Sequence, residues 1–182
     1  MKDFVFITGN QYKADYLAKW LGLPVAHEKV ELEEIQSLDA HEVAEHKARG
    51  AFNIVQKPVL VEDAALTFEA LGKLPGTLIK WFLEELACEG LAKLAAGLPT
   101  QRATASIVYA LYDGRSEVQF FDAQVAGSIV PKPRGEFGFG WNSLFLPDGS
   151  TKTYGEMTDD ELRVSSPRGH AINKLRAYLT QA

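Results

Sequence analysis

Cysteine is scarce in this sequence. The 182 residues contain a single one, Cys88, which excludes an internal disulfide framework and a cysteine-based zinc site. Long apolar runs are missing too: none approaches the length of a membrane span, and the opening MKDFVFITGN is too briefly apolar for a signal peptide. We therefore expect a protein of a reducing, cytoplasmic compartment that has no membrane partner.

An excess of positive charge is also absent. With 19 basic and 24 acidic side chains, the formal net charge is −5 at pH 7. This balance disfavours nucleic acid as a partner, although a locally basic pocket can still bind an anion. The contents of hydrophobic residues, 46%, and charged residues, 24%, are typical of a globular protein. The length fits one domain that covers residues 1–182.

Apolar residues follow two different spacings along the chain. Continuous apolar and β-branched runs predict strands at 4–7, 59–63, 103–112, 117–130 and 141–146. Apolar residues at helical spacing predict helices at 13–21, 39–55, 77–87, 90–96 and 169–179. Helical units come first and an antiparallel hairpin follows, so we expect an α/β fold with a mixed sheet.

The first corner of the chain combines a strand end, a glycine and a lysine. Thr8, Gly9 and Asn10 follow the run Phe4–Ile7, and Lys13 lies in the first turn of the next predicted helix. Free backbone N–H groups and the helix dipole make such a corner suitable for an anion such as phosphate. On these residues alone, a tight turn with Asn10 as the helix cap is the slightly favoured interpretation.

Two groups of acids are candidates for a metal site. Glu62 and Asp63 end a predicted buried strand, where ligands bind in α/β folds. Glu31, Glu33 and Glu34 form a second group. Mg²⁺ prefers hard oxygen ligands, and one or two carboxylates with substrate phosphates are enough. The structural alternatives are a helix cap at the first group and a solvated strand edge at the second.

Two loops carry residues that suit base recognition. In Phe137–Asn142, glycines alternate with large rings, so that a base could stack on a ring. The alternative is that at least one of these rings fills the core. In the segment 163–170, which we expect to be a loop, Ser166 can cap the last helix. Arg168 either points at a ligand or is an ordinary surface arginine.

Together these segments resemble the inosine triphosphate pyrophosphatase family nearly from end to end. FITGNQYK is similar to the family's T-G-N-x-x-K motif, ELEEIQ to its metal-glutamate segment, and HKARGA to the helix with a phosphate-binding lysine. PVLVEDAAL resembles the catalytic acidic strand and LPGTLIKWFLEEL the P-G-…-K-W-F helix. FGWNSLF and FLPDG resemble F-G-[WY]-D-…-F and P-D-G, and Ser166 and Arg168 match the ends of a Ser-His-Arg loop.

The resemblance implies an elongated, two-lobed α/β fold with a central cleft, usually as a homodimer. It implies hydrolysis of ITP, dITP and XTP to the monophosphate and pyrophosphate with Mg²⁺, or Mn²⁺ as the alternative ion. Asp63, Lys13 and Glu62 are then catalytic, with Asp63 orienting the attacking water, and Glu34 and Asp63 bind the metal. The implied substrate-binding residues are Thr8, Gly9, Asn10, Lys13, Lys47, Lys80, Phe139, Gly140, Trp141, Asn142, Ser166 and Arg168.

The sequence departs from the family pattern mainly on the base side. Asn142 replaces an aspartate, Pro167 replaces a histidine, and Leu162 replaces a lysine, with Arg163 beside it as a stand-in. Tyr16 stands where a glutamate is frequent. Because asparagine donates as well as accepts hydrogen bonds, we hypothesise retained pyrophosphate release with an altered or relaxed base preference. A non-catalytic nucleotide-binding protein of the same fold is the remaining alternative.

Overall fold

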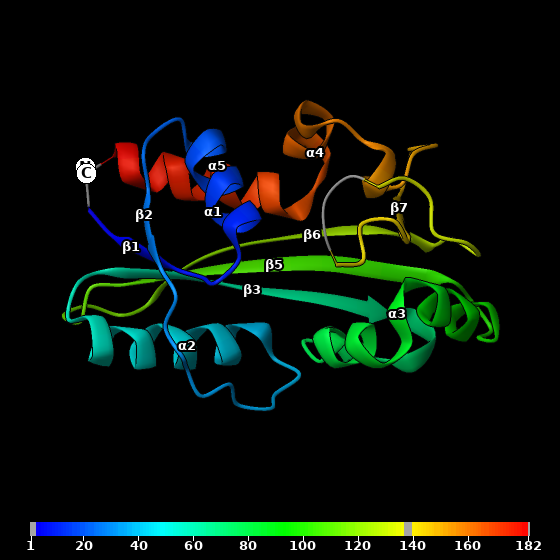
Figure 1. The fold of residues 1–182 in the computed structure, drawn as a ribbon, viewed down its shortest axis with the longest axis horizontal. Helices are drawn as coiled ribbons and strands as arrows, with labels where there is room; N and C mark the ends of the chain where they lie inside the picture. Colours follow the sequence, from blue (N-terminus) through cyan, green and yellow to red (C-terminus); the bar gives the residue numbers. More distant parts are fainter. Residues whose placement is uncertain (1–2, 137–139, 182) are drawn as a thin grey trace. The chain divides into compact units, whose positions relative to one another are not determined.

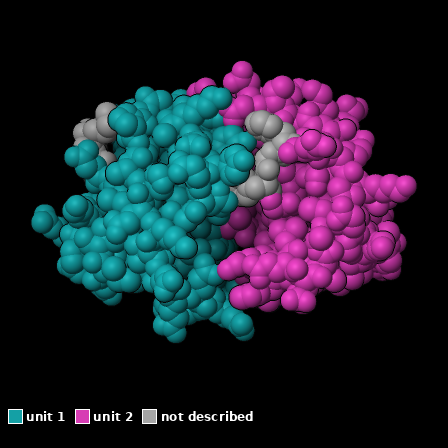
Figure 2. Space-filling model, in the orientation of Figure 1, with its two compact units in different colours: residues 1–63, 107–123, 168–182 teal, residues 64–106, 124–167 magenta. Residues whose placement is uncertain are grey.

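The computed structural model describes residues 3–136 and 140–181. Within them, seven strands form one sheet, whose path is β2–β1–β3–β5–β6–β7, with β4 paired to β3. Parallel and antiparallel pairs both occur, which confirms the predicted mixed α/β architecture. The chain divides into two compact units, coloured in Figure 2. Unit 1 comprises residues 1–63, 107–123 and 168–182, and unit 2 comprises residues 64–106 and 124–167.

The elements of each unit are as follows. Unit 1 contains β1 (Val5–Ile7), α1 (Gln11–Leu21), β2 (Ala26–Glu28), α2 (Ala40–Val55) and nearly all of α5 (Pro167–Thr180). Unit 2 contains β4 (Pro75–Gly76), α3 (Ile79–Ala96), β7 (Phe145–Pro147), α4 (Asp159–Ser165) and the 3-10 turns Glu69–Leu71 and Tyr154–Glu156. Both units take residues from β3 (Val59–Phe68), β5 (Arg102–Tyr112) and β6 (Gln119–Ile129).

In unit 1, helices cover the first strands on both faces. β1 pairs in parallel with β2 and with β3, and Val5 lies opposite Ala26 on one side and Val59 on the other. Helices α1 and α5 lie on one face of these strands and α2 lies on the other (Figure 1). Strands that are covered on both faces read as continuous apolar runs, and Val59–Val61 is such a run.

Small side chains bring α2 close to the sheet. Ala44, Ala48 and Ala51 are fully buried in a cluster with Val59 and Val61 of β3. Their helical spacing puts the three alanines on one stripe of α2. A long side chain that starts from this stripe can therefore reach β3.

Helix α1 ends where the sequence predicts and begins two residues earlier, directly after the expected cap at Asn10. The Asn10 side chain accepts a hydrogen bond from the Lys13 backbone N–H and caps the first turn, and Gly22 takes the left-handed conformation, φ 74°, that ends the helix. Helix α3 is interrupted at Ala87, which has φ 52° and ψ −175°, so it comprises the two predicted helical segments. No helix of the described residues is long and apolar enough to cross a membrane.

The prediction that a strand ends on Glu62 and Asp63 is wrong. β3 continues through both acids to Phe68, because the following residues, Ala-Ala-Leu-Thr-Phe, contain no glycine or proline that would stop an extended chain. The two acids nevertheless lie next to a strand end. Phe6 of β1 pairs with Leu60, so Glu62 falls level with Thr8, where β1 has already ended.

Two other local predictions and one alternative also need correction. The alternative of a solvated strand edge at the second acidic group is wrong, because the segment 30–35 belongs to no strand and Val30 and Leu32 pack on the unit 1 core. Residues 141–144 form a turn, and only Phe145–Pro147 is a strand. The expected loop at 163–170 is largely helical: a capping box at Thr158 starts α4, and Pro167, a favoured first helical residue, starts α5.

Candidate active site

Strand β3 presents two adjacent acids to opposite faces of the sheet. Successive strand residues alternate between faces, so Glu62 contacts Lys13 of α1 and Arg168 of α5. Asp63 contacts Lys47 of α2 on the other face. All five side chains belong to unit 1. Two charged clusters therefore meet at one point of β3, beside the end of β1.

The Glu62 carboxylate is surrounded by hydrogen-bond donors. Oε1 lies 2.9 Å from Lys13 Nζ and 3.0 Å from Arg168 Nη2. Oε2 accepts from the Tyr109 hydroxyl at 2.7 Å and from Arg168 Nε at 3.1 Å. The Glu62 side chain is 2% exposed. A carboxylate offers about four acceptor positions, and these four donors occupy them.

Burial and charge act in opposite directions on Glu62. Burial raises the pKa of this carboxyl, but Arg168 and Lys13 lower it more, and the net pKa is well below the usual range. For Arg168, burial lowers the pKa, but the nearby Glu62 carboxylate raises it by more, so the net pKa is above the ordinary value. Burial and the Glu62 charge raise the pKa of Tyr109 well above its ordinary value. At neutral pH, Glu62 is therefore ionised and Tyr109 is a donor.

The Asp63 carboxylate has fewer hydrogen-bond partners than that of Glu62. Its Oδ1 lies 3.3 Å from Lys47 Nζ, which also lies 3.3 Å from Glu34 Oε1 and donates to the Glu62 backbone carbonyl. Asp63 Oδ2 is buried and has no hydrogen-bond partner among the described residues. Burial raises the pKa of Asp63 to about 6, even though Lys47 and Lys13 lower it. This oxygen can accept a cation or a water proton.

The backbones of Lys13 and Lys47 lie on the buried stripes of α1 and α2. Lys47 shares a stripe with Ala44 and Ala51, which are fully buried against the sheet. Lys13 lies one turn before the buried Leu17 on α1. The apolar stems thus pack in the interior and the ammonium groups reach the acids of β3.

The first corner forms the capped turn that the sequence favours. The Thr8 hydroxyl oxygen accepts from the Asn10 backbone N–H at 3.1 Å, and the Asn10 side chain caps α1. Gly9 is exposed between them. The N-terminus of α1 and the Lys13 side chain therefore belong to one local structure. Binding of phosphate by this corner stays a prediction.

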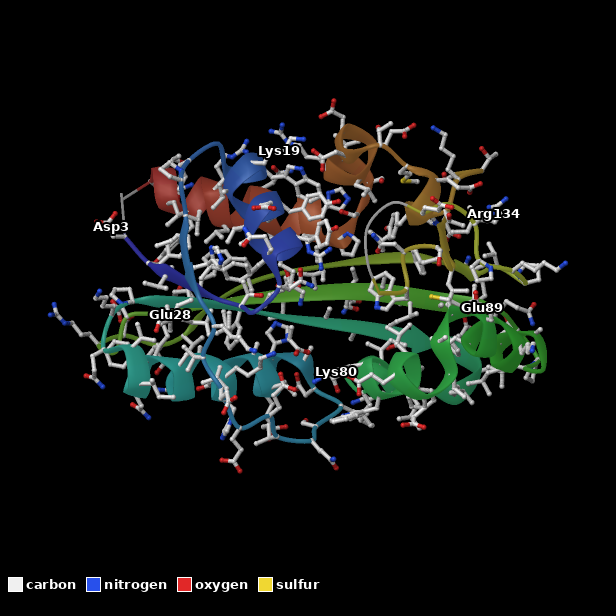
Figure 3. The ribbon with its side chains drawn as sticks, in the orientation of Figure 1. Asp3, Lys19, Glu28, Lys80, Glu89 and Arg134 are labelled. Carbon is white, nitrogen blue, oxygen red and sulfur yellow. The ribbon has the colours of Figure 1, made fainter. Side chains whose placement is uncertain are left out.

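The remaining predicted substrate residues lie mainly in unit 2. Lys80, labelled in Figure 3, lies in the first turn of α3 with its ammonium 5.1 Å from the centre of the Trp81 ring. Trp141 is buried and packs edge-on against Phe145, so the core alternative holds for this ring. Gly140, Asn142 and Ser166 also belong to unit 2, and Phe139 lies outside the described residues. Their contacts with a base stay predictions.

Sequence reasoning missed Tyr109 altogether. This residue is fully buried in β5 and its hydroxyl contacts Glu62. The available signal was a tyrosine inside the apolar run SIVYALY, because a buried tyrosine hydroxyl needs a polar partner. Across residues 3–136 and 140–181, no three His, Cys, Asp or Glu side chains gather as a metal-binding set.

These features define a class: a mixed α/β protein whose first strand ends beside lysines and acids that suit phosphates and a hard cation. A sequence model of the Ham1 family matches residues 4–178. The chain belongs to this family.

Curated relatives and solved structures agree with this assignment. The chain is 43% identical to inosine triphosphate pyrophosphatase 2 of Trypanosoma cruzi over 175 residues, 94% of this chain and 89% of that protein. It is 43% identical to inosine triphosphate pyrophosphatase of Yarrowia lipolytica over 181 residues, 97% of this chain and 95% of that protein. A HAM1 protein from Coxiella burnetii superposes with a TM-score of 0.87 at 25% identity, covering 100% of both chains. The resemblance to the inosine triphosphate pyrophosphatase family is confirmed.

Proposed function

We propose that this chain hydrolyses purine nucleoside triphosphates, ITP, dITP and XTP among them, to the monophosphate and pyrophosphate. Such an activity removes deaminated nucleotides from the nucleotide pool. The observation that carries the proposal is the cluster in unit 1, where Lys13 and Lys47 meet Glu62 and Asp63 beside the end of β1. The relatives named inosine triphosphate pyrophosphatases cover nearly the whole chain, which supports the same reaction.

The lysines suit a triphosphate. Hydrolysis at a phosphorus atom needs charge neutralisation and alignment more than covalent help. Lys13 lies next to the N-terminus of α1, where the helix dipole favours an anion. Lys47 adds a second ammonium group from α2. Both ammonium groups lie on carboxylates, and phosphate oxygens would compete for them.

The residues fit a divalent cation at Asp63 rather than at Glu62. Asp63 Oδ2 is buried without a partner among the described residues, and Asp63 already shares the Lys47 ammonium with Glu34. Because Glu34 and Asp63 both contact the Lys47 ammonium, they lie close enough together to bind one metal ion. We therefore assign Mg²⁺, or Mn²⁺, to Glu34 and Asp63. When bound, the ion would supply positive charge to the phosphates, and we propose that the Asp63 carboxylate also orients the attacking water.

The base-side departures support a shifted preference within this reaction. Leu162, at the position expected for a lysine, is a buried residue of α4, and Pro167 begins α5. These residues therefore have packing and helix-starting roles, and they offer no donor to a base. The Arg168 guanidinium lies on Glu62. We infer that this protein selects among nucleotide bases less strictly than a protein with lysine and histidine at these positions.

The experiment that tests this function measures pyrophosphate release from ITP, dITP, XTP, GTP, ATP and dUTP, with Mg²⁺ and with a chelator. We expect Mg²⁺-dependent turnover that disappears in Asp63→Asn. The matched control is Asp113→Asn, which makes the same change in the hairpin turn of unit 1, where Asp113 accepts hydrogen bonds from the backbone. This control should retain turnover.

The outcomes separate the alternatives. Selective turnover of ITP and XTP would mean that the base-side changes are tolerated, and turnover of another nucleotide would support a shifted preference. Binding of nucleotide without turnover of any would refute the enzyme and favour a nucleotide-binding protein of the same fold.

The assembly and location are also proposals. We propose a homodimer, for which the apolar surface of α3 in unit 2 provides support: Trp81 is 53% exposed and Leu86 is 41% exposed. Light scattering of the wild type and of Trp81→Glu would test it, since the charge should favour the monomer. We also propose a cytoplasmic location, which the single cysteine supports, and which fractionation of cells would test.

A further inference from the structure

We propose that Tyr109 and Glu62 are positioning residues, which fix Lys13 and Arg168 for turnover and touch neither the metal nor the substrate. The inference rests on the proposed function and deepens it. It takes Glu62 out of the catalytic group that the sequence predicts and adds Tyr109, which no motif identifies.

The first argument is that Glu62 has no acceptor position left. Four donor atoms, from Lys13, Arg168 and Tyr109, lie within 2.7–3.1 Å of its two oxygens. A metal ion at this carboxylate would have to displace one of these donors. Asp63, the neighbouring residue, has an oxygen without a partner among the described residues. The two acids are therefore not interchangeable as ligands.

The second argument is that Tyr109 interacts with polar groups of this cluster, Glu62 and Arg168, and has no access to solvent. It is 0% exposed, and its ring packs against Phe6 with the ring centres 6.2 Å apart. Its hydroxyl makes the shortest of the four contacts to Glu62, 2.7 Å. A substrate cannot reach a fully buried hydroxyl, so any effect of this group on turnover must pass through Glu62 or Arg168.

The third argument concerns geometry. The guanidinium of Arg168 contacts both oxygens of Glu62 as a planar fork. The terminal torsion of a glutamate is otherwise broad, and the Tyr109 hydroxyl fixes it from the β5 side. The orientation of one carboxylate thus sets the position of Lys13 on α1 and of Arg168 on α5. Small displacements of such groups lower turnover strongly.

The decisive variant is Tyr109→Phe, which removes the hydroxyl and keeps the ring. We expect kcat/KM for the preferred nucleotide to fall about 10-fold to 100-fold, the equivalent of one hydrogen bond to a charged group. The fall should be larger in kcat than in KM. The matched control is Tyr112→Phe on the same strand, whose hydroxyl contacts Arg49 and not Glu62. It should retain wild-type kinetics.

A second variant separates positioning from metal binding. Glu62→Gln should lower kcat but leave the Mg²⁺ concentration for half-maximal activity unchanged, whereas a loss of a metal ligand would raise it. Adding Tyr109→Phe to Glu62→Gln should cause little further loss, because both changes act on one contact. Equal, independent losses from the two substitutions would overturn the proposal, as would a raised Mg²⁺ requirement in Glu62→Gln.

A measurement without turnover guards against simple unfolding and against failure of the proposed function. The Nε–H signal of Arg168 in ¹⁵N NMR should be protected from exchange in the wild type and in Tyr112→Phe, and exposed in Tyr109→Phe. Thermal unfolding must first show that each variant is folded. If the wild type hydrolyses no nucleotide, the proposed function fails. The positioning role is then judged by binding of inorganic triphosphate in a chelator: weaker binding by Tyr109→Phe supports it, and unchanged binding refutes it.

Discussion

Replacing Asp63 with asparagine should make the metal-free protein more stable while it abolishes turnover. Burial raises the pKa of Asp63 to about 6, against an ordinary value of 3.8. The folded state therefore holds its proton over a pH range in which the unfolded chain has lost it. Stability falls as the pH rises through this range, from about 4 to about 6, and stays low above it.

The magnitude follows from the same pKa. One pKa unit corresponds to about 1.4 kcal/mol, so the ionised carboxylate lowers the free energy of unfolding by about 3 kcal/mol at pH 8. The amide in Asp63→Asn carries no charge and retains an oxygen for Lys47, which keeps its ion pair with Glu34. Because Lys47 loses part of its charge compensation, we expect a net gain of about 1–3 kcal/mol.

The assay is chemical unfolding, followed by tryptophan fluorescence at several values between pH 4 and pH 8 in a chelator. The difference between Asp63→Asn and the wild type should be near zero at pH 4 and reach its maximum above pH 7. Asp113→Asn is the control of opposite sign, because backbone hydrogen bonds lower the pKa of Asp113 to about 2. It should destabilise the protein by an amount that is constant from pH 5 to pH 8. A pH-independent difference for Asp63→Asn, or a loss of stability at pH 8, would refute the reasoning.

Substitutions at a close backbone contact, an exposed ion pair and a partly buried lysine should differ widely in their effect on stability. Gly135→Ala should prevent stable folding of unit 2, because the new methyl group would lie 2.1 Å from the Gly155 backbone. Gly149→Ala, at a similar φ but in open space, should cost only about 1 kcal/mol, and unfolding midpoints would compare the two. Arg102→Ala should change stability by less than about 1 kcal/mol, because its ion pair is exposed. Lys47→Met should lower the free energy of unfolding by about 3 kcal/mol at pH 8, because it leaves the ionised Asp63 without its cation. Urea titrations should show a smaller loss at pH 4, where Asp63 is protonated.

Local rules predict much of the fold of this chain. The cap at Asn10, the stop at Gly22 and the stripe of alanines in α2 each depend on residues a few positions apart. Such signals are readable from the sequence. The end of β3 is not, because Ala64 and the residues after it permit a continued strand, but no local signal in them shows where the strand ends. Pairing with β4 through Leu66, a contact with another segment, determines this end.

Only part of the candidate site is readable from local sequence. Lys13 follows a strand-to-helix corner that the sequence shows, whereas Lys47 is predicted only from the resemblance to the family; both lie on otherwise buried helical stripes. The partners of Glu62 could not be predicted in this way. Arg168 is 106 residues away along the chain and Tyr109 is 47 residues away, and only the packing of α5 and β5 on β3 brings them together.

The alternation of a strand gives two neighbouring acids opposite chemistry. Glu62 and Asp63 differ by one position, so they face different helices, and their pKa values move in opposite directions. Two acids whose environments separate their pKa values in this way are suited to different roles. Glu62, with a low pKa and four donors, is a fixed anion that organises cations. Asp63 has a raised pKa and an oxygen without a partner among the described residues. Its ionised form lowers the free energy of unfolding, so it gains most from a cation. The predicted stability gain in Asp63→Asn and the predicted loss of turnover in Tyr109→Phe are consequences of this one arrangement.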